Sequence, residues 1–152
     1  MLIDISMYLP CTPSVAIDHV NSSRLLLHIA KPLVTFTAVE PPQFPDIWAD
    51  GTYWVSMRLF GIIPLGKQAI VISHPTGDVF TLRDNGHSAL IKTWDHIITV
   101  TPSGSGTRYR DQVTIEAGLL TPLVWLFALF FYSHRQRRWR QLARAGFNYG
   151  NH

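Results

Sequence analysis

The sequence predicts an α+β fold in which a curved antiparallel sheet of about six or seven strands wraps around one long C-terminal helix. Between Thr52 and Ile115 nearly every segment has the alternating or β-branched pattern of a strand, interrupted by short turns. From about residue 117 to residue 145 the pattern changes to that of an apolar and then basic helix. A sheet that curves around such a helix can enclose an apolar cavity.

The segment before the main sheet predicts one further strand and two short helices. Residues 3–9 alternate as a strand does. Thr12-Pro13 is a typical helix start, a capping side chain followed by proline at the first helical position, and predicts a helix to about residue 20. Ser22 or Ser23 can cap a second helix, which Pro32 should end.

Five strands are expected between a proline-rich loop and the final helix, joined by short turns that favour an antiparallel meander. The loop, residues 40–50, contains three prolines, and its Phe44 and Trp48 should either pack on the sheet edge or form a gate. Asp84-Asn85-Gly86 is predicted to be a turn, because Asn and Gly readily adopt positive φ. The expected extended segments are residues 33–39, 52–60, 67–74, 78–83, 87–101 and 106–115.

The composition favours one globular domain over residues 1–152. Hydrophobic residues make up 47% and charged residues 15% of the chain, so disorder is not expected. Cys11 is the only cysteine, which excludes an intramolecular disulfide. The first residues lack the basic and apolar regions of a secretory signal, so a cytoplasmic location is expected, with peripheral contact at the inner membrane face as an alternative.

The final helix combines an uncharged apolar run, residues 117–132, with a basic end. The run is shorter than the roughly 20 residues that span a bilayer, so contact with a membrane surface is the better alternative. One stripe of the helix should lie on the sheet: Trp125, Ala128, Leu129, Tyr132, Gln136, Trp139, Leu142 and Ala143. Four side chains lie off it and could pack on the short helices, on a homodimer partner or on a bilayer: Leu123, Phe127, Phe130 and Phe131.

The positive charge of the chain is concentrated at the basic end of this helix. The formal net charge is +3, and five of the thirteen lysine and arginine residues lie within residues 135–144. Nucleic-acid binding normally needs basic residues spread along a face with aromatic stacking platforms, so no nucleic-acid partner is expected. The five residues are Arg135, Arg137, Arg138, Arg140 and Arg144.

The order of elements resembles the helix-grip fold of the START-like, or SRPBCC, superfamily, which includes polyketide cyclases and lipid-transfer proteins. This order of elements covers nearly the whole chain, and at the level of residues the chain is similar to bacterial ligand-binding domains of this superfamily. The similarity rests on Gly51-Thr52-Tyr53-Trp54, residues 60–66, Trp94-Asp95-His96, residues 109–113 and residues 132–139. The resemblance implies a cavity and an apolar small-molecule ligand, and it transfers no catalytic residues.

The strongest candidate for chemistry is a histidine–carboxylate pair on the last two strands. A hairpin centred near Ser103-Gly104 would set His96 opposite Asp111. Residues two apart share a face of a strand, so the aromatic and apolar neighbours of this pair should line the same surface, under the helix. The predicted ligand-binding set is Trp94, His96, Ile98, Tyr109, Asp111, Val113, Trp125, Leu129 and Tyr132.

Three functions remain open from the sequence. The first is non-enzymatic binding of a lipid-like or polyketide-like molecule between sheet and helix. The second is a cyclase- or dehydratase-type enzyme in which His96 and Asp111 supply a general base, although two buried polar groups also pair for purely structural reasons. The third is a membrane-associated interaction protein that uses the Phe-rich and Arg-rich helix. The seven histidines show no metal-binding spacing, so no metal or cofactor is expected.

Overall fold

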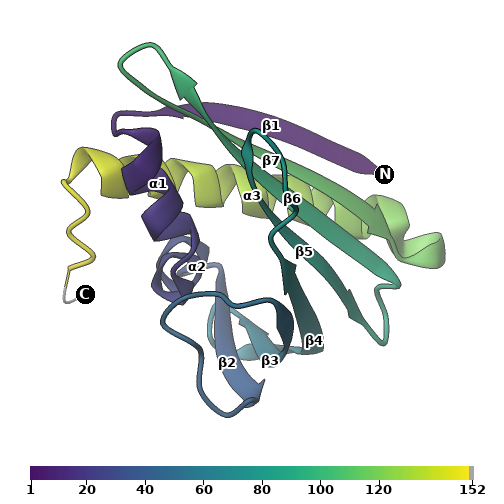
Figure 1. The fold of residues 1–152 in the computed structure, drawn as a ribbon. Coiled ribbons are helices and arrows are strands. Elements are labelled where there is room, and N and C mark those ends of the chain that lie inside the picture. Colours follow the sequence, from purple (N-terminus) through teal and green to yellow (C-terminus); the bar gives the residue numbers. More distant parts are fainter. Residues whose placement is uncertain (151–152) are drawn as a thin grey trace.

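A computed structural model describes residues 1–150 and has the predicted α+β architecture (Figure 1). A single antiparallel sheet of seven strands runs in the order β1-β7-β6-β5-β4-β3-β2. It curves around one long helix, and two short helices follow the first strand. The strands are β1 (Leu2–Leu9), β2 (Val34–Glu40), β3 (Gly51–Leu59), β4 (Ile63–Ser73), β5 (Phe80–Ser88), β6 (Thr93–Ser103) and β7 (Gly106–Glu116).

The two short helices, α1 (Pro13–Val20) and α2 (Ser23–Ala30), begin where the capping signals predict. The Oγ1 of Thr12 accepts a hydrogen bond from the backbone N–H of Val15 at 3.3 Å. The Oγ of Ser22 accepts one from the N–H of Arg24 at 3.2 Å. Each cap satisfies a backbone donor that has no partner within its own helix, which fixes the start of the helix.

The long helix α3 (Thr121–Arg144) follows a single 3-10 turn, η1 (Gly118–Leu120). It ends at Arg144, within one residue of the predicted end, and Gly146, with a φ of +68°, lets the chain turn back. The N–H of Phe147 donates to the carbonyl of Leu142 at 2.9 Å, and the N–H of Gly146 donates to Ala143 at 3.2 Å. These two bonds form a Schellman motif, which satisfies carbonyls that the helix itself leaves free.

Strand β5 corrects the prediction of a turn at Asp84-Asn85-Gly86, because these residues lie inside it. Strand β6 therefore begins at Thr93 instead of residue 87. Gly86 does not have a positive φ, but a Cβ there would lie 2.7 Å from the carbonyl oxygen of Ala69. The missing side chain of Gly86 therefore allows β4 and β5 to approach closely, and no turn is formed there.

Strand β4 is also longer than predicted, since it begins at Ile63 and includes Pro64 and Gly66, which the sequence assigns to a turn. A register shift between Met57 and Arg58 of β3 accommodates this segment. Such a bulge explains why proline and glycine occur within a paired strand, because regular pairing is interrupted there.

The register of the β6–β7 hairpin differs from the prediction by two residues. Ser103 pairs with Gly106, so that His96 lies opposite Val113 and Ile98 lies opposite Asp111. The predicted pairing of His96 with Asp111 is therefore wrong. Because side chains alternate with a period of two, this even shift leaves both residues on the same face of the sheet.

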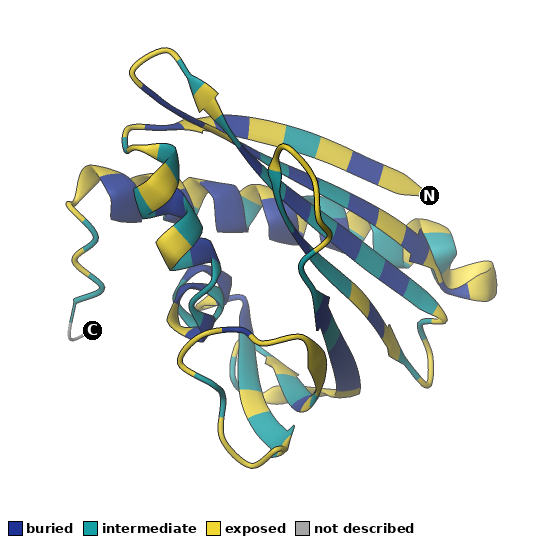
Figure 2. Ribbon diagram, viewed as in Figure 1, coloured by how far each residue is buried: buried dark blue, intermediate teal, exposed yellow. Residues whose placement is uncertain are grey.

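The core lies between the concave face of the sheet and the helices. Helix α3 packs against β1, β7 and α2, and α1 and α2 close the side near its C-terminal half (Figure 1). Buried and more exposed residues alternate along β6 and β7, as Figure 2 shows. Most of the predicted stripe of α3 is buried, but Trp125 and Leu129 are only half-buried, and Phe131 and Arg135 are buried in addition.

The four apolar residues off the predicted stripe divide into two groups. Phe131 is buried and its ring stacks on that of Phe127, with centroids 6.0 Å apart, whereas Leu123 and Phe130 remain exposed. Within residues 1–150, none of the helices combines the length and the apolar character required to cross a bilayer.

The proline-rich loop packs on the junction of α1 and α2. The N–H of Trp48 donates to the carbonyl of Asn21 at 2.7 Å, and the hydroxyl of Ser23 donates to the carbonyl of Pro45 at 2.5 Å. Trp48 is buried in the core and Phe44 contacts it edge-on, whereas Ile47 is exposed. The loop thus contributes one aromatic side chain to the interior.

Candidate functional site

The candidate site is a cavity of about 300 Å³ between the sheet and α3. Its walls come from α2, α3 and the loop that contains Trp48, together with the inward faces of strands β2 to β7. Most lining residues are aliphatic or aromatic, as expected for residues on the buried face of a curved sheet. They include Leu25, Leu26, Val34, Phe36, Met57, Ile70, Ile72, Leu82, Ile98, Phe127 and Phe131.

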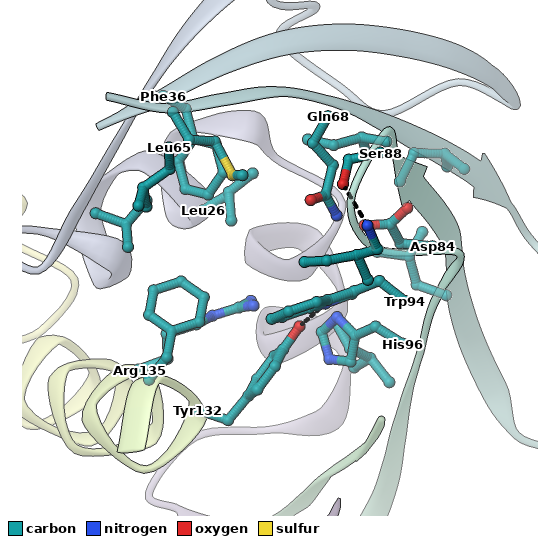
Figure 3. Close-up of a pocket in the computed structure, with 18 of the residues that line it drawn as sticks. Leu26, Phe36, Leu65, Gln68, Asp84, Ser88, Trp94, His96, Tyr132 and Arg135 are labelled. Atoms are coloured by element: carbon teal, nitrogen blue, oxygen red, sulfur yellow. Dashed lines mark hydrogen bonds between the residues drawn. The ribbon is translucent and has the colours of Figure 1, made fainter. Parts of the chain in front are cut away.

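A small number of polar side chains interrupt this apolar wall (Figure 3). Gln68, Asp84 and Ser88 reach the cavity from β4 and β5, and His96 reaches it from β6. Tyr132 and Arg135 project from α3 on the opposite side. A mostly apolar cavity with a few converging polar groups is the usual form of a small-molecule site.

His96 and Asp111 form a buried hydrogen-bonded pair despite the shifted register. The Nε2 of His96 lies 2.7 Å from Oδ1 of Asp111, because the two residues are diagonal neighbours on one face. Asp111 accepts two further hydrogen bonds, from the hydroxyl of Tyr109 at 3.0 Å and from Nε2 of Gln136 at 2.9 Å. Donors from two strands and from α3 therefore meet on one carboxylate.

The surroundings of this pair favour a neutral imidazole beside an ionised carboxylate. Burial lowers the pKa of His96, although the hydrogen bond that it donates to Asp111 opposes that shift. Burial alone would raise the pKa of Asp111, but the hydrogen bond from His96, with help from Arg135 and Gln136, holds it below its ordinary value. Neutral His96 then donates from Nε2, so its Nδ1 keeps a free lone pair.

Tyr132 presents a hydroxyl to the cavity. The Nε1–H of Trp94 donates to this hydroxyl at 2.8 Å, so the oxygen acts as the acceptor in that bond. Among residues 1–150 the hydroxyl has no further hydrogen-bonding partner, which leaves its own proton for another group. Burial raises the pKa of Tyr132, so it remains a donor over the working pH range.

Arg135 is the charged group that reaches the cavity from α3. Its side chain is 7% exposed, and its guanidinium carbon lies 4.9 Å from the ring centroid of Tyr132 and 5.6 Å from that of Phe131. In the described part of the chain it takes part in none of the ion pairs, and its Nε is buried without a hydrogen-bonding partner.

Arg135 remains charged in this environment. Burial lowers the pKa of its guanidinium, but the nearby Tyr109, Tyr132, Asp111 and Asp84 outweigh that effect and raise it. An arginine is in any case protonated under all ordinary conditions.

Asp84 lies on the sheet side of the cavity and is half-buried. Its Oδ1 accepts a hydrogen bond from the N–H of Val71 at 2.8 Å, at a point where the regular pairing of β4 with β5 is interrupted. Burial raises the pKa of Asp84 to about 7, against the opposing effects of Val71 and Arg135. The carboxyl is therefore partly protonated near neutral pH.

The structure brings five of the nine sequence-predicted site residues to the cavity wall: Trp94, His96, Ile98, Tyr109 and Tyr132. Asp111 and Val113 are buried on the same face but lie outside the wall. Trp125 and Leu129 are half-buried and also lie outside it, and the indole N–H of Trp125 donates to the carbonyl of Leu2 at 3.1 Å.

Sequence reasoning missed Arg135 and Gln68 as cavity residues, and it favoured a turn for Asp84 over a place at the mouth of a cavity. Arg135 was assigned to a basic cluster and Asp84 to a turn, and the structure corrects both. A signal for Arg135 exists, because it lies three residues after Tyr132 and four before Trp139, on the buried stripe of α3. Its neighbour in sequence, Arg137, is exposed as expected.

In the part of the chain that the structure describes, no three His, Cys, Asp or Glu side chains gather as a metal site would need. His152, one of the seven histidines, lies outside the described residues.

The curved sheet and the long C-terminal helix that it surrounds define the class of fold, the helix-grip fold. Residues 48–143 match the family described as Domain of unknown function (DUF8410), and the chain belongs to this family. The matched segment contains His96, Asp111 and Arg135. No curated protein matches the sequence.

Solved structures with the same fold include a START superfamily protein from Mycobacterium smegmatis, 11% identical, with a TM-score of 0.65, covering 95% of this chain and 97% of that one. Another is Ara h 8.0201, which is 7% identical, with a TM-score of 0.66 and coverage of 95% of this chain and 98% of that one. The Aha1 dimer from Colwellia psychrerythraea is 8% identical, with a TM-score of 0.64 and coverage of 94% and 96%. At these identities the likeness shows the fold alone.

Proposed function

We propose that this protein binds a hydrophobic small molecule in the cavity between the sheet and α3. The observation that carries the proposal is the cavity itself, whose volume of about 300 Å³ is at the low end of the range for small-molecule sites. Its size favours a compact ligand, such as a short lipid-like chain or a small ring system. The affinity would come mainly from burial of apolar ligand surface.

The ligand can be sought directly by native mass spectrometry of protein purified without detergent, beside a denatured control. An added mass that disappears on denaturation would establish an occupied cavity and give the class of its ligand. Displacement of a neutral fluorescent apolar probe by added compounds measures binding even if the purified protein carries no ligand.

Two neighbouring residues of α2 provide a matched pair of variants. Leu26 lines the cavity, whereas Leu27 is half-buried outside its wall. Leu26→Trp should fill the space and weaken binding of the apolar probe by about tenfold or more, because large-for-small substitutions at packed positions exclude other occupants. Leu27→Trp should bind the probe as the wild type does. Equal binding by both variants would place the ligand elsewhere.

A second candidate function is catalysis by His96 and Asp111. The observation in its favour is that Nε2 of His96 is bonded to Asp111, which leaves Nδ1 as the basic nitrogen of a residue in the cavity wall. An imidazole oriented by a carboxylate in this way can act as a general base in a cyclase- or dehydratase-type reaction.

Mass spectrometry of ligands recovered after incubation separates catalysis from binding. If the site is catalytic, the recovered compound should be chemically altered by the wild type, and Asp111→Asn should bind it without altering it. A ligand recovered unchanged from the wild type would favour the simple binding function.

A further inference from the structure

We infer that the ligand carries an acidic head group, a carboxylate attached to an apolar body, which Arg135 and Tyr132 bind inside the cavity. This inference rests on the proposed function and specifies the chemistry of the ligand. It follows from the hydrogen-bonding capacity that the protein itself leaves unused.

The guanidinium of Arg135 is a buried cation without a partner in the part of the protein that the structure describes. Arg135 carries five N–H donors and is 7% exposed, yet among residues 1–150 none of these donors has a hydrogen-bonded partner. A buried charge without such partners is costly, so folded proteins normally pair it or use it to bind something. An acceptor brought by a ligand would fill this place.

The carboxylates nearest to Arg135 accept hydrogen bonds from other groups of the protein. Asp111 accepts from His96, Tyr109 and Gln136, and it lies outside the cavity wall. Asp84 accepts from the N–H of Val71 and lies across the cavity from Arg135 (Figure 3). Neither forms an ion pair with the guanidinium, whose nitrogens remain open to a third carboxylate.

The two donors, the guanidinium of Arg135 and the hydroxyl of Tyr132, lie close together on α3. Arg135 and Tyr132 lie one helical turn apart, and Figure 3 shows both side chains projecting from α3 into the cavity. The rings of Phe131 and Tyr132 hold the guanidinium, and Trp94 occupies the Tyr132 oxygen as a donor. The Tyr132 proton and the guanidinium N–H groups can therefore reach the same anionic group, and a planar carboxylate matches the guanidinium geometry.

The remaining walls determine the rest of the ligand. Beyond Arg135 the cavity is lined by Leu26, Phe36 and Leu65, all apolar (Figure 3). The part of the ligand that lies against these three residues should therefore be a hydrocarbon chain or ring without charge. Medium-chain fatty acids and aromatic carboxylic acids have this chemistry.

The test compares acids with neutral compounds of the same shape. Decanoic acid is compared with decanol, and 2-naphthoic acid with 2-naphthalenemethanol, by displacement of the neutral fluorescent probe. At neutral pH the wild type should bind at least one acid about tenfold or more tightly than its alcohol, since charge-assisted hydrogen bonds are stronger than neutral ones.

Variants on α3 assign the preference to one residue. Arg135→Met keeps an unbranched side chain at this position without its charge, and should lose the preference for the acid over the alcohol. Arg137→Met, on the exposed side of the same helix, is the matched control and should retain the preference. Arg135→Lys should keep part of it, because it retains the charge without the planar donor geometry.

The outcomes separate the two proposals. Equal affinity of the wild type for acids and alcohols would overturn the acidic head group and leave the binding function standing. Failure of the wild type to bind the neutral probe and all four compounds would overturn both. The comparison of acids with alcohols needs only the wild type, so it decides the question even if Arg135→Met does not fold.

Discussion

At the scale of single residues, the interior combines an apolar wall with charges that serve different purposes. Asp111 is surrounded by three donors and fixes the relative positions of β6, β7 and α3. Arg135 has no such set of partners in the described structure, and its surroundings hold it in place without neutralising it. A buried charge whose hydrogen bonds are made within the protein is typical of a structural role, whereas a buried charge that lacks partners is typical of a binding site.

Asp84 should make the stability of the protein depend on pH. The free carboxyl has a pKa of 3.8, whereas burial raises the pKa of Asp84 to about 7 in the folded state. Between these two values the folded state holds a proton that the unfolded state has released. The stabilisation that comes from this bound proton is therefore complete below about pH 4 and is lost as the pH rises to about 7.

Asp84→Asn tests this dependence, because its amide oxygen can still accept from Val71 and only the charge is removed. The variant should gain stability relative to the wild type as the pH rises from about 5 to about 8, as measured by urea denaturation at several pH values. Asp78→Asn, at an exposed loop residue, is the control. A constant difference between Asp84→Asn and the wild type over this range would contradict the assignment.

The sequence predicted the cavity residues of β6 but missed the charged residue that α3 contributes. Alternation along β6 and β7 was sufficient to place Trp94, His96 and Ile98 on one face, because burial in a sheet follows a period of two. Arg135 was missed because arginine is usually exposed and the residues around it are basic. Only its position on the buried stripe of α3 distinguishes it from Arg137.

At the scale of elements, β4 and β5 show how one sequence signal can have two structural uses. An Asp-Asn-Gly segment is typical of a turn, yet here Asp84 completes an interrupted strand pairing and Gly86 allows two backbones to approach. The physical reason is tertiary: the close carbonyl belongs to Ala69, which is distant in sequence, so no local pattern could reveal it.

Gly86→Ala should therefore destabilise the protein. Its Cβ would meet the backbone oxygen of Ala69 at 2.7 Å, which cannot move as a flexible side chain would. The expected loss in the free energy of unfolding is about 1–3 kcal/mol, measured by urea denaturation. Gly77→Ala is the matched control, since a Cβ there has nothing within 4 Å and no positive φ to strain. An unchanged midpoint for Gly86→Ala would show that the strands separate at little cost.

At the scale of the whole molecule, the predicted fold class is confirmed because it depends on the order of the elements and not on their exact ends. Helix caps are local: the cap at Thr12 was predicted at the residue where it occurs, and the second lies at Ser22, one of the two serines that the sequence offered. The predicted register of the hairpin was wrong because the register depends on the geometry of two turn residues. That geometry fixes the pairing along the whole of β6 and β7. The cavity depends on side-chain packing from many elements, and the sequence alone could not give its volume.

Strand β1 has one neighbour in the sheet, β7, and Ile3 of β1 pairs with Val113. Ribosomes make proteins from the N-terminus, so β1 emerges long before the strand that receives it. Until then its buried residues, among them Ile3 and Leu9, have no place to pack. Partners so distant in sequence slow folding and leave apolar segments exposed to aggregation while synthesis continues. Because of this pairing, the N-terminal strand has no partner in the sheet until β7 has been synthesised.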